Sequence, residues 1–272
     1  MAPRTDIVAS HDRSTDPRDY QHLPQPLALM RKAFPAEYRI PPHDHERDQL
    51  LYAGLGTMRV RTAGHSWTIP PDRALYVPAG LEHSVRMLGP VEMWTLYIAP
   101  NAAPSLPRHA KVFATSELLR ALIRALLAEP VVYAAASRAH RIALLALDEI
   151  QSAAPLALAI PMPRDRRLLK LCEALIEAPH DTLSLDAWAD RTGASRRTLA
   201  RLFQSECGQS FTVWRRRVRF HAAIDLLDKG VPVAEVARRH GYSSPSAFSA
   251  AFRQVFGQSP RAVIRSGEFA PR

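Results

Sequence analysis

Cysteine is scarce in this sequence, since only Cys172 and Cys207 occur among its 272 residues. They stand in none of the paired spacings that mark structural zinc sites or redox-active dithiols, so we expect buried thiols in a reducing compartment. No apolar run reaches the ~20 residues that span a bilayer, and the polar start lacks the apolar core of a signal peptide. These absences predict a cytoplasmic protein with no membrane partner.

Acidic residues are outnumbered, and the basic excess is concentrated near the C-terminus. The formal net charge is +10. Residues 164–272 hold 19 Lys and Arg against 11 Asp and Glu, so a difference of +8 falls in this part of the chain. A basic surface favours polyanionic partners such as nucleic acid.

The N-terminal region is predicted to be mainly β-structure. A polar segment, residues 1–26, is expected to be mobile. Residues 27–100 then show short alternating apolar runs, separated by Gly and Pro turns. That pattern is typical of a small antiparallel barrel or sandwich.

Helices are predicted to follow the strands. Within residues 101–153, the stretches Thr115–Glu129 and Ser137–Ala153 carry apolar residues at helical spacing, which predicts a helical hairpin. Residues 154–163 contain three prolines and cannot form one continuous helix, so we expect a linker there. Residues 164–268 form the helical C-terminal domain.

An internal repeat divides this C-terminal domain. Trp188–Ser195 aligns with Val236–Ser243, and the alanine, glycine and serine of the first segment recur 48 residues later. Further apolar and polar positions recur at an offset of 49, after one inserted residue. The same structural unit is therefore expected twice.

Each repeat has the sequence form of a helix-turn-helix, which is two short helices joined by a turn. Gly193 and Gly241 suit turn positions with positive φ. Ser195, and either Ser243 or Ser244, stand where the second helix needs an N-cap. Burial of the apolar stripe would leave one polar face of the first unit toward solvent, made of Arg196, Arg197, Thr198, Ala200 and Arg201.

A long helix is predicted between the two units, over Ser210–Asp228. Its 19 residues span about 28 Å, which can hold the two second helices roughly one DNA turn, ~34 Å, apart. Its arginine run, which includes Arg217, is expected to contact phosphates. One chain could then read two successive major grooves.

The repeat, the arginine-rich central helix and the ending from Gly241 to Pro260 resemble the AraC/XylS family of bacterial transcription regulators. The resemblance implies a double-stranded DNA operator as partner, with RNA polymerase as a further one. It places base-reading positions at Arg197, Ala200 and Arg201, and at Ser246, Ala247 and Ala250. The full set of expected DNA contacts is Ser195, Arg196, Arg197, Thr198, Arg201, Arg217, Ser244, Ser246, Ala247, Ser249 and Arg253.

The small side chains of the second unit offer few bidentate contacts to bases. We therefore predict that Arg197 and Arg201 carry most base discrimination. The second unit is expected to add phosphate contacts through Arg253 and thymine-methyl contacts through its alanines.

Three histidines stand out in the N-terminal region. His43 and His45 fall at i and i+2, which puts them on one face of a strand, and His83 follows a tight turn. These segments resemble the two sequence motifs of a cupin barrel, which implies one divalent transition metal held by histidines and a glutamate. Here the acidic position is Gln49, a neutral and weaker donor. Two readings stay open: a metal site, or histidines lining a metal-free pocket for an organic effector.

The sequence therefore predicts an α+β protein, with a cupin-like antiparallel β-barrel and helical hairpin followed by an all-α double helix-turn-helix domain. Its predicted function is a sequence-specific transcriptional regulator that senses a small molecule or metal ion and is not an enzyme. The alternatives are a cupin metalloenzyme fused to a DNA-binding domain and a nonspecific architectural DNA binder. A homodimer through the helical hairpin is also expected.

Overall fold

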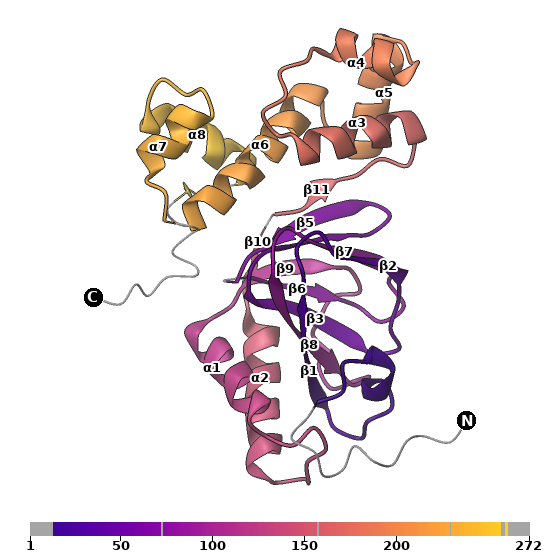
Figure 1. Cartoon of the computed structure of the whole chain (residues 1–272), viewed down its shortest axis with the longest axis vertical. Helices are drawn as coiled ribbons and strands as arrows, with labels where there is room; N and C mark the ends of the chain where they lie inside the picture. Colours follow the sequence, from indigo (N-terminus) through magenta and orange to yellow (C-terminus); the bar gives the residue numbers. More distant parts are fainter. Residues whose placement is uncertain (1–12, 72, 157, 229, 257–258, 261–272) are drawn as a thin grey trace. The chain divides into compact units, whose positions relative to one another are not determined.

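The computed structural model describes most of the chain (Figure 1), namely residues 13–71, 73–156, 158–228, 230–256 and 259–260. These residues form two compact units, 13–60 with 69–156 and 61–68 with 158–260. None of the helices in the described ranges is both long enough and apolar enough to cross a membrane. The end of the predicted DNA-binding domain, residues 261–268, lies outside the described residues.

Two antiparallel sheets are present, as predicted. The strands of one sheet are, in spatial order, β1 (Leu27–Phe34), β8 (Val91–Ile98), β3 (Asp48–Leu55), β6 (Arg73–Val77), β9 (Lys111–Ala114) and β10 (Pro155–Leu156). Those of the other are β11 (Ile160–Pro161), β5 (His65–Ile69), β4 (Met58–Arg61), β7 (His83–Met87) and β2 (Arg39–His43).

Burial along the strands follows from how many of their faces are covered. In β7, buried and half-buried residues alternate, because successive side chains point to opposite faces. All five residues of β6 are buried. The reason is that helices α1 (Glu117–Leu127) and α2 (Arg138–Ser152) pack their apolar stripes on the sheet that contains β6.

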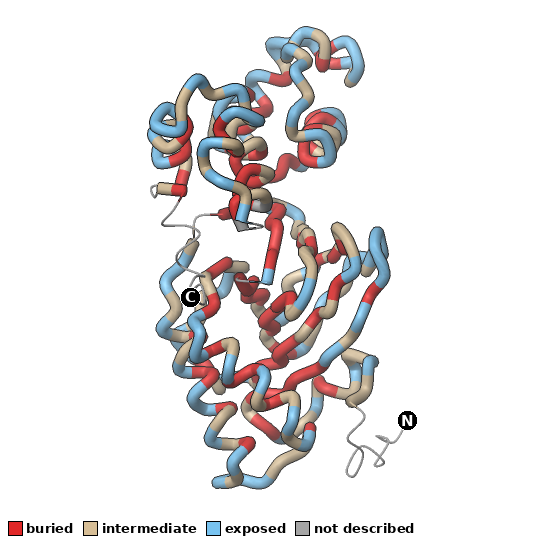
Figure 2. The backbone as a smooth tube through the Cα atoms, turned by 60° about the vertical axis from the view of Figure 1, so that its left-hand side comes forward, coloured by how far each residue is buried: buried red, intermediate tan, exposed pale blue. Residues whose placement is uncertain are grey.

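The predicted helical hairpin is confirmed by α1 and α2. Ser116 and Ser137 cap them, each by accepting a hydrogen bond from a backbone N–H three residues on. In Figure 2 buried and exposed residues alternate along both helices, as expected for amphipathic helices on a sheet.

Two segments contain more local structure than the sequence predicts. Residues 13–26, expected to be mobile, include a 3₁₀ turn over Pro17–Tyr20, and Tyr20 is buried and stacks on Tyr97. The predicted linker 154–163 forms short strands, because β10 pairs with β9 and β11 pairs with β5. Proline excludes a helix interior, but it is tolerated at a strand edge.

The C-terminal compact unit is helical after β11. Its helices are α3 (Arg166–Glu177), α4 (Leu185–Thr192), α5 (Arg196–Cys207), α6 (Phe211–Asp228), α7 (Val233–Arg239) and α8 (Pro245–Phe256). The pairs α4–α5 and α7–α8 confirm the two predicted helix-turn-helix units, and α6 is the connecting helix. Cys172 and Cys207 are both free and buried.

The turns have the predicted chemistry. Gly193 and Gly241 adopt φ values of 67° and 77°, a region that a side chain disfavours. Ser195 Oγ accepts from the N–H of Thr198, and Ser244 Oγ accepts from the N–H of Ala247. Ser244, rather than Ser243, is therefore the N-cap of α8.

Candidate functional site

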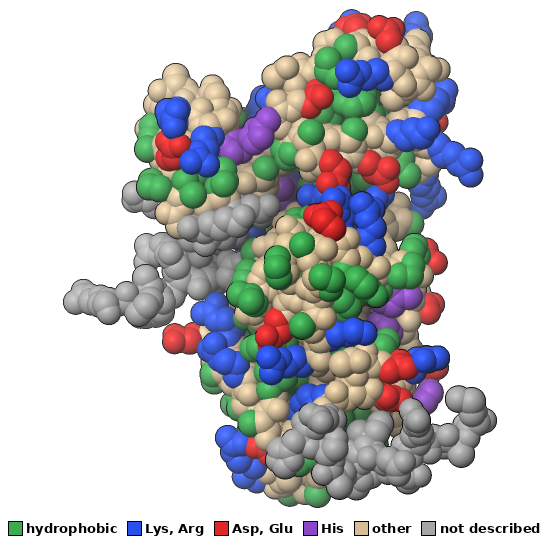
Figure 3. Space-filling model, viewed as in Figure 1, with side chains coloured by type: hydrophobic (Ala, Val, Ile, Leu, Met, Phe, Trp, Pro, Cys, Tyr) green, Lys and Arg blue, Asp and Glu red, His purple; other side chains and the backbone are tan. Residues whose placement is uncertain are grey.

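Helix α5 presents a basic face to solvent. Leu199 and Phe203 are fully buried on its inner side, and the side chains of Arg196, Arg197 and Arg201 are exposed. Arg196 lies 3.6 Å from the carboxylate of Asp186, in an exposed pair that solvent screens. Figure 3 shows Lys and Arg side chains gathered over the first helix-turn-helix. This face can donate hydrogen bonds to a polyanion.

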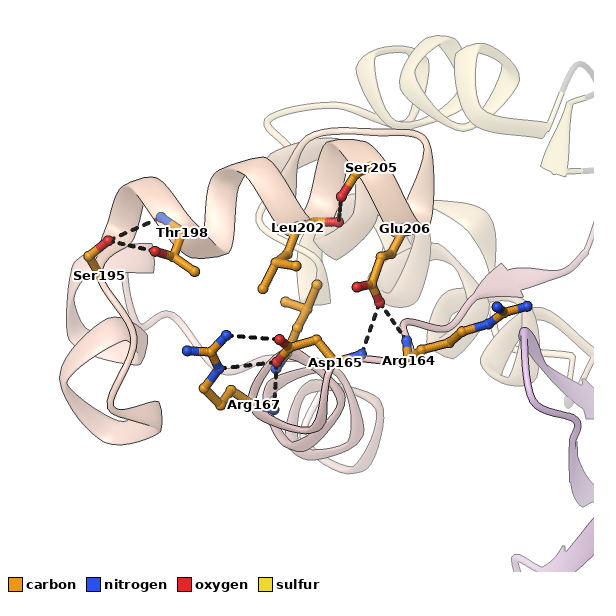
Figure 4. A network of polar contacts seen from close by, with 9 residues as sticks. Arg164, Asp165, Arg167, Ser195, Thr198, Leu202, Ser205 and Glu206 are labelled. Atoms are coloured by element: carbon orange, nitrogen blue, oxygen red, sulfur yellow. Dashed lines mark hydrogen bonds and ion pairs between the residues drawn. The ribbon is translucent and has the colours of Figure 1, made fainter.

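The predicted contacts Ser195 and Thr198 belong to the start of α5. The hydroxyl of Ser195 caps the helix and lies 2.9 Å from the hydroxyl of Thr198 (Figure 4). Both residues therefore shape the helix N-terminus, where free backbone N–H groups and the helix dipole favour a phosphate.

The second helix-turn-helix presents smaller side chains. Ser246, Ala247 and Arg253 are exposed on α8, whereas Ser244 and Ser249 are half-buried. The inner side of α8 carries phenylalanines that pack around Phe220 of α6, namely Phe248, Phe252 and Phe256. The structure thus separates a small polar face from an aromatic core.

The arginine run of α6 is used differently from the prediction. Arg217 donates from Nη1 to the carbonyl of Ala159 at 3.1 Å, and burial lowers its pKa. Arg215 donates to the carbonyl of Leu183, and Arg219 donates to the carbonyls of Pro179 and Asp181. These guanidinium groups bind the protein's own backbone, so the expected phosphate contact of Arg217 is not supported.

Glu206, in the last turn of α5, is an anchor that the sequence analysis missed. Its carboxylate accepts hydrogen bonds from the N–H groups of Arg164, at 2.6 Å, and Asp165, at 3.0 Å (Figure 4). Asp165 is itself the N-cap of α3. The contact fixes the end of α5 to the start of α3, and no local sequence pattern marks it.

In the N-terminal compact unit, residues 13–60 with 69–156, the three predicted histidines come together. His43 and His83 are paired across β2 and β7, and their ring centroids are 4.3 Å apart. His45 lies just beyond β2 rather than on it, and Gly80 donates its N–H to the carbonyl of His45 at 2.9 Å. One nitrogen from each ring lies within 4.8 Å of the others. We call His43, His45 and His83 the histidine cluster.

Hydrogen bonds orient two of these rings. Nδ1 of His43 lies 2.8 Å from the carbonyl of Pro41, and Nδ1 of His83 lies 3.0 Å from the carbonyl of Leu81. A carbonyl can only accept, so each Nδ1 carries the proton and each Nε2 keeps its lone pair. Nε2 of His45 and Nε2 of His83 are buried without a hydrogen-bond partner.

Two histidines of the cluster are electrostatically suited to stay uncharged. Burial, and then the neighbouring histidines, lower the pKa of His45 to about 4. Burial also lowers the pKa of His83 to about 4. Neutral imidazole is the form that coordinates metal ions, so these rings are ready ligands at neutral pH.

A cavity of about 250 Å³ opens beside the histidine cluster in the N-terminal compact unit. Gln49 lies in it, paired across the strands with Tyr97, and hydrogen-bonded to the Tyr97 side chain. Oε1 of Gln49 is buried without a partner. Thr15 and Pro17 also line this cavity, so the segment predicted to be mobile forms part of its wall.

Two family descriptions match the chain. That of an AraC-like ligand-binding domain matches residues 28–164, and that of a helix-turn-helix domain matches residues 188–266. The chain belongs to the AraC family. It is a DNA-binding transcriptional regulator with an N-terminal ligand-binding domain.

The chain is also similar to individual proteins. The HTH-type transcriptional regulator NimR of Escherichia coli is 29% identical over 253 residues, which cover 93% of this chain and 92% of NimR. RipA of Corynebacterium glutamicum is 34% identical over 100 residues, 37% of this chain and 30% of RipA. Among solved structures, ToxT of Vibrio cholerae aligns with a TM-score of 0.36 at 12% identity, over 89% of this chain and 99% of ToxT.

Proposed function

We propose that this AraC-family regulator senses a divalent transition metal, or a small molecule bound beside it, through the histidine cluster. The observation that carries the proposal is the orphaned pair of buried nitrogens, Nε2 of His45 and Nε2 of His83. A buried polar atom without a partner is costly, and a ligand that accepts its lone pair removes that cost.

The residues present fit a metal ion. Metal-binding histidines commonly donate their other N–H to a backbone carbonyl, as His43 and His83 do here. Three imidazoles suit zinc, copper, nickel or iron, and the Gln49 oxygen offers a weak fourth donor. A metal held there would supply a positive charge facing the cavity.

Such a ligand controls transcription only by binding one arrangement of the protein better than another. Occupation of the cavity would tighten the contacts between its other walls and the segment that holds Thr15 and Pro17. The regulated output would be how the two helix-turn-helix units meet DNA.

For the DNA contacts, we propose that Arg197 and Arg201 discriminate bases. Both are exposed on α5, and an arginine can form a bidentate pair with guanine. Arg253 would contact phosphate, and Ala247 and Ala250 would contact thymine methyl groups.

We propose a homodimer as the working assembly, formed through α1 and α2. Leu118, Leu144 and Leu145 are each more than 40% exposed on these helices. Exposed large apolar side chains on neighbouring helices favour an interface. RNA polymerase is a further partner we propose, by virtue of the regulatory role.

We also propose that the protein has no catalytic activity of its own. No Asp or Glu is among the described residues that line the cavity, so a metal there would lack a carboxylate to act as general base. The metalloenzyme alternative needs such a group.

Metal analysis tests the sensor proposal. Full-length protein purified without chelator is expected to carry one equivalent of metal, and His43→Ala combined with His83→Ala is expected to lose it. His109→Ala, an exposed histidine outside the cluster, is the matched control. Operator affinity measured with and without the metal should differ in the parent protein and in His109→Ala, but not in the double variant. Protein that never binds stoichiometric metal would refute the metal part of the proposal.

A further inference from the structure

The cavity beside the histidine cluster holds almost no formal charge of its own. Lys32 is the only charged side chain among the described residues that line it. The remaining walls are largely apolar and include Met30, Phe34, Ile40, Leu51, Val85 and Met93.

The donors around the cluster are neutral as well. Three imidazoles would coordinate in their uncharged form, and Gln49 stands where a carboxylate would otherwise contribute a negative charge. Gln49 and His83 are each only 2% exposed. A divalent cation held here would therefore keep its full charge in surroundings of low polarity, which is unfavourable without a counter-charge.

The acids next to His43 and His45 in the sequence do not supply a ligand to the cluster. Asp44 and Glu46 line a second pocket that also contains His43 and His45, and both acids are exposed to solvent. Neither carboxylate lies close enough to join the group of metal-ligating atoms formed by the three histidines. Water screens exposed charges, so these two acids would offset only part of the charge of a cation in the cavity.

We propose that the effector brings the missing negative charge: the site takes a small organic acid, with its carboxylate at the histidine cluster and its apolar body against the cavity walls. This inference rests on the proposed metal-sensing function. The substitution of Gln49 for an acidic ligand is what makes the site depend on an external anion.

The cavity also limits the size of the acid. Its volume of about 250 Å³ lies just below the ~300–1,000 Å³ typical of sites for drug-sized ligands, so one ring or a short chain fits. Lys32 stands at the wall, 5.3 Å from the centroid of the Phe34 ring, with its ammonium donating to the carbonyl of Thr15. Its charge adds to the preference for an anion over a neutral analogue of the same shape.

Calorimetry with matched probes tests this inference. Zinc-loaded full-length protein is titrated with benzoate and benzamide, and with hexanoate and hexanamide, which differ mainly in charge. At least one acid is expected to bind ten-fold or more tightly than its amide, and chelation of the zinc is expected to abolish that preference.

Two variants make the test specific to the charge balance. Gln49→Glu supplies the carboxylate from the protein and is expected to retain zinc but lose the preference for the acid. Lys32→Met is expected to weaken acid binding several-fold and leave zinc content unchanged. Unchanged acid preference in Gln49→Glu would overturn the inference.

The outcomes separate this inference from the sensor proposal. Protein that fails to bind zinc refutes the metal site itself, and the inference falls with it. Protein that binds zinc but takes the amides as well as the acids refutes the anionic effector alone, while the metal site stands.

Discussion

Arginine side chains in this protein differ by what their guanidinium groups contact. In α6, Arg215, Arg217 and Arg219 hold backbone carbonyls of the protein. In α5, Arg197 and Arg201 are exposed, and neither guanidinium forms a hydrogen bond or ion pair with another of the described residues. A guanidinium without an internal partner can bind an external one without first losing a hydrogen bond, so α5 is where DNA recognition is best supported.

Arg201→Ala is expected to reduce the preference for the operator over random DNA. A bidentate arginine–guanine pair contributes about 1–3 kcal/mol of discrimination, which corresponds to roughly 5- to 150-fold. Gel-shift titration on both DNAs measures the ratio. Arg253→Ala, if that side chain contacts phosphate, should weaken both complexes equally. An unchanged ratio in Arg201→Ala would mean that another residue reads the base.

His240 predicts a pH dependence of stability. Its pKa is lowered first by burial and further by His180, whose ring centroid lies 5.1 Å away, with Arg219 also nearby. Well above pH 6.5, the ordinary pKa of histidine, the residue is neutral in both folded and unfolded chains. Below that pH the unfolded chain gains a proton that the folded chain resists, so the free energy of unfolding falls.

Denaturant titration between pH 7.5 and 5 checks this prediction. His240→Gln is expected to flatten the pH dependence by up to one proton, because the substituted residue does not titrate. His109→Gln, at an exposed position, should leave it unchanged. Equal slopes in parent and His240→Gln would contradict the assignment.

At the scale of the element, α5 is fixed at both ends by polar contacts. Ser195 caps its N-terminus, and Glu206 ties its last turn to the start of α3. The apolar contacts of Leu199 and Phe203 hold the middle against the core. The helix that carries the exposed arginines is thus set in one orientation before DNA arrives, which lowers the ordering cost of binding.

Glu206→Ala is expected to lower the free energy of unfolding by about 1–3 kcal/mol, since two backbone N–H groups lose a charged acceptor. The free energy of unfolding of Glu206→Gln should fall between those of the parent and Glu206→Ala, because glutamine keeps an acceptor oxygen. Chemical denaturation of the full chain measures both. Gln204→Ala, exposed two residues earlier on α5, is the matched control and should stay within about 0.5 kcal/mol of the parent. A loss in the control as large as in Glu206→Ala would exclude a specific anchor.

At the scale of the whole molecule, the proposed homodimer would form through the helical hairpin of α1 and α2. Leu144→Glu combined with Leu145→Glu is expected to weaken the dimer ten-fold or more, because charge enters an apolar contact. Light scattering across a concentration series reports the mass. Leu55→Glu, at a leucine that is 63% exposed on β3, is the control. A parent protein that is monomeric with and without DNA would exclude the dimer.

The net charge of +10 predicts a salt-dependent affinity for DNA in general. The logarithm of the binding constant should fall linearly with the logarithm of salt concentration. At physiological salt, operator should still be bound about a thousand-fold more tightly than random DNA. An architectural binder would show the same slope without that preference, so fluorescence anisotropy on both DNAs separates the two.

The sequence by itself determined the two helix-turn-helix units and which histidines of the ligand-binding domain are candidate ligands. A turn glycine such as Gly193 and a cap such as Ser195 act over a few residues, so local spacing reveals them. The apolar stripe that includes Leu199 is equally local. Such features depend on residues close together in the sequence, so they can be predicted without knowledge of distant contacts.

Only the tertiary structure decided which polar groups face inward. Arg217 reaches Ala159, and Glu206 reaches Asp165, across 58 and 41 residues of chain. The placement of His45 beside Gln49 and the burial of Tyr20 likewise depend on packing between separate segments. A side chain carries no local mark of its distant partner, because the same arginine can bind a carbonyl or a phosphate, and the fold chooses between them.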